Sequence, residues 1–377
     1  MKKVQTSSNP FEHHEMKGKK TMSITWFKVA VFAMVGAFVM AANAVETYTD
    51  ANGVTWTYEL NTDTVADGST AVTFHNEGNA PCIPTDIKID AETIPWTFTK
   101  DGTAYTVTKV GNGAFGGGSQ LYGRLTVPDS VNQIFDYGFA DNCDFTLVTL
   151  GKGMTYGYRY MMYGAKMKAL LMTGALGNSS GSPLGNTGVK TIIFTNTGFN
   201  NNLHGSYFFG GVSGATAFAP RCEYTYAGTK NTVYYYGPNE PFDMAFDLEA
   251  GKVTVTPTTE EYLVKALEWA KTFKSDFYLD TTINITNSIG ASVSVTAEQL
   301  QNVTFQTPPW FLRFAVDSQA QLDNILAAVS TDTPIIIELT KLNTPITVPE
   351  GREVAILAKS NMTFDKKRRN GLVISLR

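Results

Sequence analysis

The sequence predicts a mainly β protein, in which a short solenoid of stacked repeats follows a β lead-in and precedes a duplicated α/β C-terminal region. Three observations predict this fold class. Aromatic residues make up 12% of the 377 residues and charged residues only 17%, a composition that favours strands over charge-rich exposed helices. Of the 33 glycines, 23 fall within residues 105–238, where they disfavour any long helix. In the same segment, aliphatic and Phe positions recur 24 residues apart.

Residues 1–44 are typical of a secretory signal, in which positive charge, an apolar run and small residues follow in that order. The apolar run covers 29–42, and the small residues of 42–44 place the cleavage between Ala44 and Val45. The run is shorter than the roughly 20 residues that span a bilayer as a helix. We therefore expect no stable membrane span after signal removal, with a retained anchor as the alternative. Three methionines are candidates for the start: Met1, Met16 and Met22.

Residues 45–104 are predicted to form a small antiparallel β lead-in. Apolar and polar residues alternate in Val54–Tyr58 and again in Ile94–Phe98. Turn-forming Asn-Gly and Asp-Gly pairs break these runs, as expected for short strands joined by tight turns. The open end of a stacked array needs a cover, so we expect this segment to cap the repeats that follow it.

Residues 105–240 are predicted to be the solenoid. The stretch Val110–Phe115 has an aliphatic residue, then three others, then a small residue and Phe, and Ile134–Phe139 has the same order. Short strands are expected between the copies, at 125–127 and 147–150. A degraded third unit follows at 156–169, and a fourth opens with a strand at 189–194. Periods of 20 to 29 residues with one strand each are typical of leucine-rich repeats, whose units bury their apolar faces only by stacking.

The repeats resemble the BspA-like leucine-rich repeats of exported bacterial and some eukaryotic surface proteins. The likeness covers roughly residues 105–240 and is strongest over the first 45 of them. The second copy departs from the family pattern, since Phe135 replaces the usual Gly and Gly138 the usual Ala. The resemblance implies a short leucine-rich-repeat solenoid that serves adhesion or protein–protein interaction at a cell surface. It assigns these residues to the repeat core: Val110, Gly111, Ala114, Phe115, Ile134, Gly138, Phe139 and Cys143.

A Tyr-rich stretch within 220–238 ends the repeats. Such clustered tyrosines form either a recognition surface or a closing strand on the last repeat. Beyond it, apolar residues at helical spacing predict an amphipathic helix over 259–274, opened by a capping box of Thr258 and Glu261. A second helix is marked by Leu322, Ile325, Leu326 and Val329.

Strand-like segments follow each of these helices, and their offsets are nearly constant. Ile283 and Ile346 lie 63 residues apart, and Val293 and Val354 lie 61 apart. We interpret residues 241–310 and 311–377 as a duplication of a helix plus strands. The pattern also resembles the first turns of a pectin-lyase-like parallel β-helix. Because the chain stops inside a strand-like run, this last strand either closes the domain or belongs to a longer β-helix.

No constellation typical of catalysis is present, and no cofactor or metal is expected. Without the signal, His75 and His204 are the only histidines, and neither lies in a nucleophile motif. Cys82, Cys143 and Cys222 match no zinc spacing and are interpreted as buried thiols, with one disulfide as the alternative. Three acidic residues of the repeats are interpreted as solvated, with a calcium-attracting rim as the alternative: Asp136, Asp141 and Asp144.

The charge balance disfavours nucleic acid as a partner. The whole chain carries −4. Removing the six Lys and two acidic residues of the signal from its 30 basic and 34 acidic residues leaves 24 and 32, a net charge of −8. The one basic run, 366–369, is interpreted as a solvated turn.

The sequence thus predicts a secreted or surface-exposed, non-enzymatic protein that binds a protein or glycan partner through the solenoid. Two alternatives remain at this point. One is a fragment of an exported carbohydrate-active β-helix enzyme, and the other is a structural matrix or surface-layer subunit.

Overall fold

The computed structural model divides into two units, residues 1–44 and 45–377. The predicted signal, Ala44 included, lies outside the described residues, and Val45 opens the first strand. The residues that the structure describes are 45–75, 82–84, 87–116, 120–174, 178–179, 181–195, 208–221, 230–286, 289, 293–296, 298–306, 312–329, 331, 335–339, 346–352, 354–358 and 372–376.

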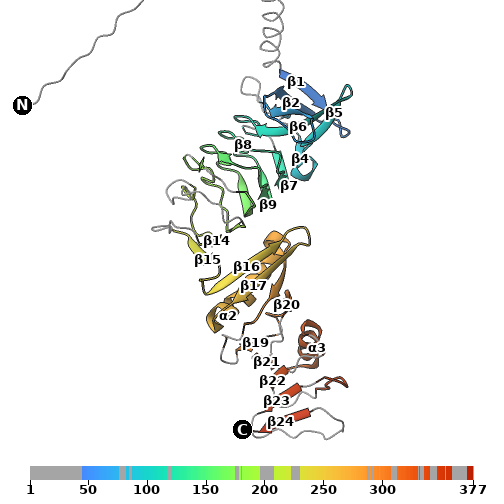
Figure 1. Ribbon diagram of the computed structural model, residues 1–377, viewed down its shortest axis with the longest axis vertical. Coiled ribbons are helices and arrows are strands. Elements are labelled where there is room, and N and C mark those ends of the chain that lie inside the picture. The colour runs from blue at the N-terminus through green and yellow to red at the C-terminus, as the bar shows by residue number, and fades with distance from the viewer. Residues whose placement is uncertain are drawn as a thin grey trace, which may run out of the picture. The chain divides into compact units, whose positions relative to one another are not determined.

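The predicted mainly β class is confirmed, because the described residues form many short strands and only two α-helices (Figure 1). Most of the strands pair in parallel, as stacked repeats require.

The lead-in is antiparallel at its start and parallel where it meets the repeats. Alternation places Trp56 and Tyr58 on the buried face of β2, where they pack with Phe74 of β3 and Phe98 of β5. β1, β2 and β3 are antiparallel, and so are β5 and β6, but β3 and β6 pair in parallel. The elements are β1 (Val45–Thr49), β2 (Thr55–Leu60), β3 (Thr70–Phe74), β4 (Lys88–Asp90), the 3-10 turn η1 (Ala91–Thr93), β5 (Thr97–Lys100) and β6 (Thr103–Val110).

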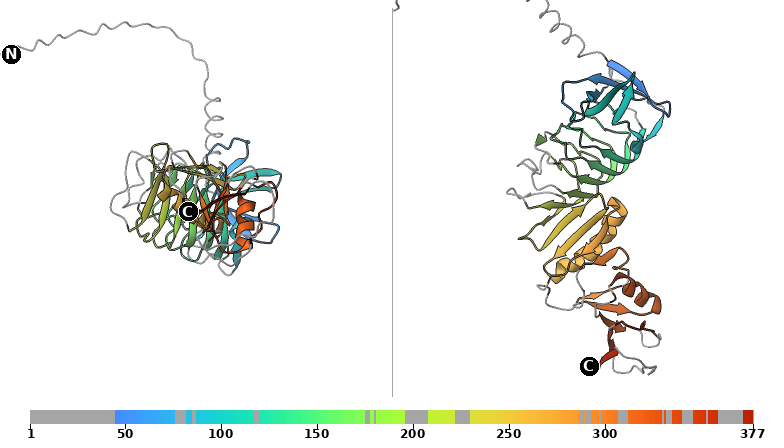
Figure 2. Two further views of the ribbon diagram at one scale, coloured as in Figure 1. Left: turned by 90° about the horizontal axis from the view of Figure 1, so that it is seen from below. Right: turned by 45° about the vertical axis from the view of Figure 1, so that its right-hand side comes forward.

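The repeats form a coil with two parallel sheets, whose strands run side by side in Figures 1 and 2. We call the seven-stranded one the repeat sheet; its order is β15-β14-β13-β11-β9-β7-β4. The other one is the end of an eight-stranded sheet that starts in the lead-in; we call this end, β6-β8-β10-β12, the smaller sheet. The strands are β7 (Gln120–Val127), β8 (Gln133–Ile134), β9 (Asp144–Leu150), β10 (Tyr156–Gly157), β11 (Lys166–Met172), β12 (Asn178–Ser179), β13 (Thr191–Phe194), β14 (Thr216–Pro220) and β15 (Thr232–Tyr236).

The register sets the length of each coil. Val110 pairs with Ile134 in the smaller sheet, as the 24-residue recurrence predicts. In the repeat sheet Leu125 pairs with Val148 and Val148 with Leu170, so successive coils there take 23 and then 22 residues. The predicted third unit is therefore a full coil, although it lacks the Ala-Phe signature.

The C-terminal region contains two smaller sheets and both helices. One sheet has the order β16-β17-β18-β20 and the other β19-β21-β22-β23-β24. The elements are β16 (Phe242–Asp247), β17 (Lys252–Pro257), α2 (Glu260–Phe277), β18 (Asp280–Ile283), β19 (Ser294–Val295), β20 (Val303–Phe305), β21 (Arg313–Val316), α3 (Gln319–Ala328), β22 (Ile335–Leu339), β23 (Val354–Ala358) and β24 (Leu372–Leu376).

Helix α2 begins one residue later than predicted, and its N-cap is shifted by the same one residue. Thr259, not Thr258, is the N-cap, and its hydroxyl accepts from the Tyr262 amide. The Thr258 hydroxyl instead donates to the Pro241 carbonyl oxygen at 2.8 Å. The predicted capping box is therefore wrong, and Glu261 forms an exposed ion pair with Lys265 in place of a reciprocal cap.

Each helix connects two parallel strands, α2 between β17 and β18 and α3 between β21 and β22. The order strand, helix, strand is thus shared by the two segments, and the duplication itself stays a prediction. The nearly constant offsets between strand-like segments of the two halves are not matched by the observed strands, because Ile283 lies in β18 whereas Ile346 lies outside any strand.

Candidate binding surfaces on the repeats

The predicted core residues line the inside of the coil. Phe115 and Phe139 are fully buried, and their rings stack with centroids 4.7 Å apart and planes 6° apart. Backbone hydrogen bonds between adjacent coils identify the equivalent position in later coils. The Phe139 amide donates to the Met161 carbonyl, and the Met162 amide donates to the Pro183 carbonyl. Met162 and Leu184 thus take the place of the ring. Val110, Ala114, Ile134 and Cys143 are also buried, so the predicted set supports the fold.

Two of the predicted core positions leave little room for a Cβ. A Cβ at Gly111 would lie 2.6 Å from the carbonyl oxygen of Phe74 in the lead-in. At Gly138 it would lie 2.7 Å from Cγ2 of Ile134 in the same coil.

The outward face of the repeat sheet is partly covered by α2. Phe218 of β14 lies 5.0 Å from the Trp269 ring and 5.1 Å from the Phe273 ring, both on α2. The Asp276 carboxylate of α2 forms an ion pair with Nζ of Lys168 of β11 at 2.6 Å. These outward apolar residues are buried in one cluster with the helix: Leu147, Ala169, Leu171, Ile193 and Phe218. This part of the strand face is closed to a ligand.

The turns between the two sheets carry a group of aromatic side chains, which we call the turn patch: Phe135, Tyr137, Tyr158, Tyr160 and Tyr163. Phe135 stacks on Tyr158 at 4.4 Å, and Tyr137 packs against Tyr160 at 5.4 Å. Each pair joins equivalent positions of adjacent coils. Tyr137 keeps 39% of its surface exposed.

In each of the two coils a charged residue lies between the two aromatic residues, and the two charges are opposite. Arg159 lies 3.6 Å from a carboxylate oxygen of Asp136 and places its guanidinium over the Tyr160 ring at 5.2 Å. Two adjacent coils therefore present an aromatic–charge–aromatic row each. The corresponding residues of the flanking coils are Gly111-Asn112-Gly113 and Ser180-Gly181-Ser182, so the sequence confines the patch to two coils.

Backbone conformation distinguishes the turn patch further. Tyr137 and Tyr160 have φ of 56° and 63°, in the left-handed region. The equivalent residue of the first coil, Gly113, has φ of 64° and carries no steric penalty there. A left-handed conformation costs about 1 kcal/mol for a residue with a side chain. Tyr137 and Tyr160 thus occupy a backbone conformation that suits glycine better than tyrosine.

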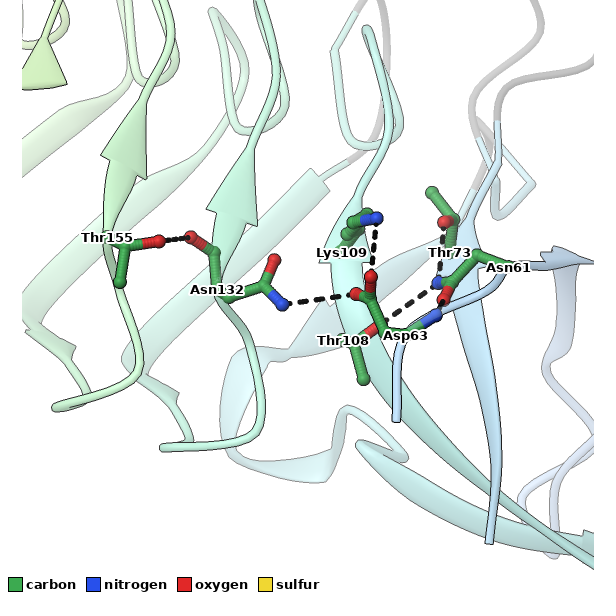
Figure 3. Close-up of polar contacts among 7 residues, drawn as sticks. All are labelled: Asn61, Asp63, Thr73, Thr108, Lys109, Asn132 and Thr155. Atoms are coloured by element: carbon green, nitrogen blue, oxygen red, sulfur yellow. Dashed lines mark hydrogen bonds and ion pairs between the residues drawn. The ribbon is translucent and has the colours of Figure 1, made fainter. Parts of the chain in front are cut away.

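A polar network on the smaller sheet joins the lead-in to the coil (Figure 3). Asp63 accepts from Nζ of Lys109 at 2.8 Å and from Nδ2 of Asn132 at 3.1 Å. Burial raises the pKa of the Asp63 carboxyl, but hydrogen bonds from Lys109, Thr108 and Asn132 outweigh it, and the pKa is lowered overall. Asp63 and Lys109 of this network form an ion pair, whereas Asn132 Oδ1 is buried with no partner among the described residues, and we assign the network to stability.

The remaining predicted chemistry is accounted for by packing. His75 lies 3.4 Å from Glu59, away from any nucleophile motif. Among the described residues no group of three His, Cys, Asp or Glu side chains could hold a metal ion. Cys82 and Cys143 are buried free thiols, which agrees with the first of the two interpretations for them. His204, Cys222 and the basic run 366–369 lie outside the described residues.

The Tyr-rich stretch ends the repeat sheet as its last strand, β15. Tyr236 is buried there and donates to the Phe194 carbonyl, and Tyr234 packs against Trp269. Of the two interpretations, the structure favours the closing strand. No helix in the described part of the chain is long and apolar enough to cross a membrane.

Comparison with protein-family models and with curated proteins finds no match. Among solved structures, a leucine-rich cell surface protein from Faecalibacterium prausnitzii is similar, with 14% sequence identity and a TM-score of 0.30. The match covers 86% of this chain and 91% of that one. At this identity the neighbour's role does not extend to the present chain, whose function has to be inferred from its own surface.

Proposed function

We propose that the chain is an exported, non-enzymatic surface protein that binds a protein partner through the turn patch. The observation that carries the proposal is the pair of left-handed tyrosines, Tyr137 and Tyr160, in equivalent positions of adjacent coils. Backbone strain of this kind is retained where a side chain must be presented, and here it presents two rings from a rigid coil.

The composition of the patch supports a protein as the partner. Tyr, Phe and Arg are enriched in protein interfaces because they offer large rigid contact area with a polar tip. Asp136 and Arg159 lie between the aromatic pairs and supply hydrogen-bonding groups at the centre. The strand face near α2 does not compete as a site, since its apolar residues are already buried.

Export and surface location are part of the same proposal. They rest on the predicted signal at 1–44 and on cleavage between Ala44 and Val45. The competing functions, a polysaccharide-degrading β-helix and a self-assembling matrix subunit, make different predictions in the experiment below.

The test compares retention of the fluorescent full chain on immobilised proteins from neighbouring bacterial and host epithelial cells. The double variant Tyr137→Gly, Tyr160→Gly removes both rings and gives these positions the residue of the first coil. Loss of the ring contacts is offset by relief of the left-handed strain, so we expect the melting temperature to change little. We expect retention to fall at least tenfold.

Tyr278→Gly is the matched control. Tyr278 is also left-handed, with φ of 60°, and 48% exposed, but it lies at the end of α2, outside the patch. Equal retention of the double variant and the parent chain would reject the patch. Release of sugars from an offered polysaccharide, or self-association that accounts for all retention, would reject the binding function in favour of an enzyme or a matrix subunit.

A further inference from the structure

A cavity of about 490 Å³ opens over the beginnings of four neighbouring strands of the repeat sheet. It is separate from the turn patch. Register places Lys88 of β4 beside Gln120 of β7, and Tyr122 of β7 beside Asp144 of β9. Asp144 is in turn paired in register with Lys166 of β11. Cavities of roughly 300–1,000 Å³ are the size that small ligands occupy in proteins.

The charges lining this cavity are balanced and unpaired. Lys88 and Lys166 contribute two positive charges, and Asp141 and Asp144 two negative ones. All four are exposed, and none forms an ion pair or side-chain hydrogen bond with another described residue.

Cations further along the same strands behave differently. Arg124 lies two residues beyond Tyr122 on β7 and pairs with Glu92. Lys168 lies two residues beyond Lys166 on β11 and pairs with Asp276 of α2. Lys88 and Lys166 thus keep their charges available, and a ligand in the cavity would meet both donors and acceptors.

Apolar surface completes the lining. Leu121 and Cys143 are each 1% exposed and form part of the floor. The Tyr122 side chain is 46% exposed and offers a ring and a hydroxyl at the rim. Gln120 and Asn142 add amide groups that both donate and accept.

We propose that this cavity is a binding site for a neutral carbohydrate, a short oligosaccharide. Sugar hydroxyls donate to the carboxylates and accept from the ammonium and amide groups, and the C–H face of a sugar ring packs on Tyr122. An anionic ligand would be opposed by Asp141 and Asp144, and a cationic one by Lys88 and Lys166, because the lining sums to zero charge. The site is independent of the proposed turn-patch function.

The test places the full chain on an array of immobilised neutral glycans of hexoses and N-acetylhexosamines, beside sialylated and sulfated glycans. Calorimetry then measures the best neutral probe, with free amino acids as zwitterionic comparison. We expect neutral glycans to bind, with little dependence on salt concentration. Asp144→Asn and Tyr122→Ala should each weaken the binding at least tenfold.

Two controls separate this site from other effects. Asp101→Asn removes an exposed carboxylate from the hairpin turn between β5 and β6 and should bind as the parent does. The double variant Tyr137→Gly, Tyr160→Gly should also keep its glycan affinity, which separates this site from the turn patch. The proposal is overturned if no neutral glycan binds, if charged glycans or amino acids bind more tightly, or if folded Asp144→Asn binds as the parent does.

Discussion

Asp63 joins the lead-in to the coil through its side chain. Its carboxylate reaches Lys109 of β6 and Asn132 of the next coil, which lies 69 residues away in the chain (Figure 3). The side chains of Asp63 and Lys109 are each only 20% exposed, so solvent screens their ion pair incompletely. Charged hydrogen bonds in such a place contribute more to stability than exposed ion pairs do.

We expect Asp63→Asn to lower the free energy of unfolding by about 1–2 kcal/mol at neutral pH. Because the pKa of Asp63 is lowered in the folded chain, its contribution is fully present above about pH 4, the usual pKa of an unfolded Asp. It is lost as the pH falls through the lower folded value. Thermal melts from pH 7 to 2 should show the gap between parent and variant closing at the acid end, whereas Asp101→Asn should leave stability unchanged. A gap that is constant with pH would contradict the assignment.

The two described cysteines should be chemically silent. Burial raises the pKa of Cys143 to about 12 and that of Cys82 well above its usual range, so neither forms the reactive thiolate at pH 8. We expect iodoacetamide to modify neither residue in the native chain and both after denaturation without a reductant. Peptide mass spectrometry measures this residue by residue. A disulfide linking Cys82 or Cys143, or native modification of either, would be the contrary result.

At the scale of elements, α2 joins the repeat sheet to the C-terminal region. Its buried face contains Trp269 and Phe273, which contact Phe218 of β14. The same helix contributes Asp276 to an ion pair with β11. The repeat sheet therefore depends on a helix that lies outside the repeats in sequence.

Phe273→Ala tests this dependence. The ring is fully buried, and its removal should cost about 3–5 kcal/mol. Hydrogen exchange should accelerate in α2 and also in β11, β13 and β14. Lys271→Ala, on the exposed side of the same helix, should change stability by no more than about 0.5 kcal/mol. Faster exchange limited to α2 and its own sheet would show that the helix does not support the repeats.

The elements that sequence reasoning found are those with a periodic signal. The 24-residue recurrence located the pairing of Val110 with Ile134, and helical spacing located α2 within a few residues. The cap was misplaced by one residue because Thr258 and Thr259 are chemically alike, and only the backbone selects between them. The third coil looked degraded because Met162 replaces Phe while filling the same buried position.

The candidate sites were missed for a different reason. The 24-residue recurrence marks buried positions, whereas the turn patch consists of the exposed Tyr137 and four partly buried aromatic residues. Its signal was nevertheless present, since Phe135-Asp136-Tyr137 and Tyr158-Arg159-Tyr160 lie 23 residues apart, one coil length. The covering of the strand face by α2 and the cavity near Tyr122 both result from tertiary packing. The spacing of residues along the sequence does not predict such packing.

At the scale of the whole molecule, the described residues form two apolar clusters. One fills the lead-in and the inside of the coil, and the other fills the C-terminal region and extends onto the outward side of the repeat sheet. The aromatic side chains on the turns of the two central coils belong to neither cluster. The central claim is that this surface makes the contact.

Hydroxyl-radical footprinting of the full chain, free and bound to a protein recovered by the retention assay, tests that claim most directly. Mass spectrometry reads the oxidation of each tyrosine separately. We expect oxidation of Tyr137 and Tyr160 to fall several-fold in the bound state, while the comparably exposed Tyr278 stays as reactive as in the free chain. Unchanged oxidation of Tyr137 and Tyr160 in the bound state, with protection at other residues, would contradict it.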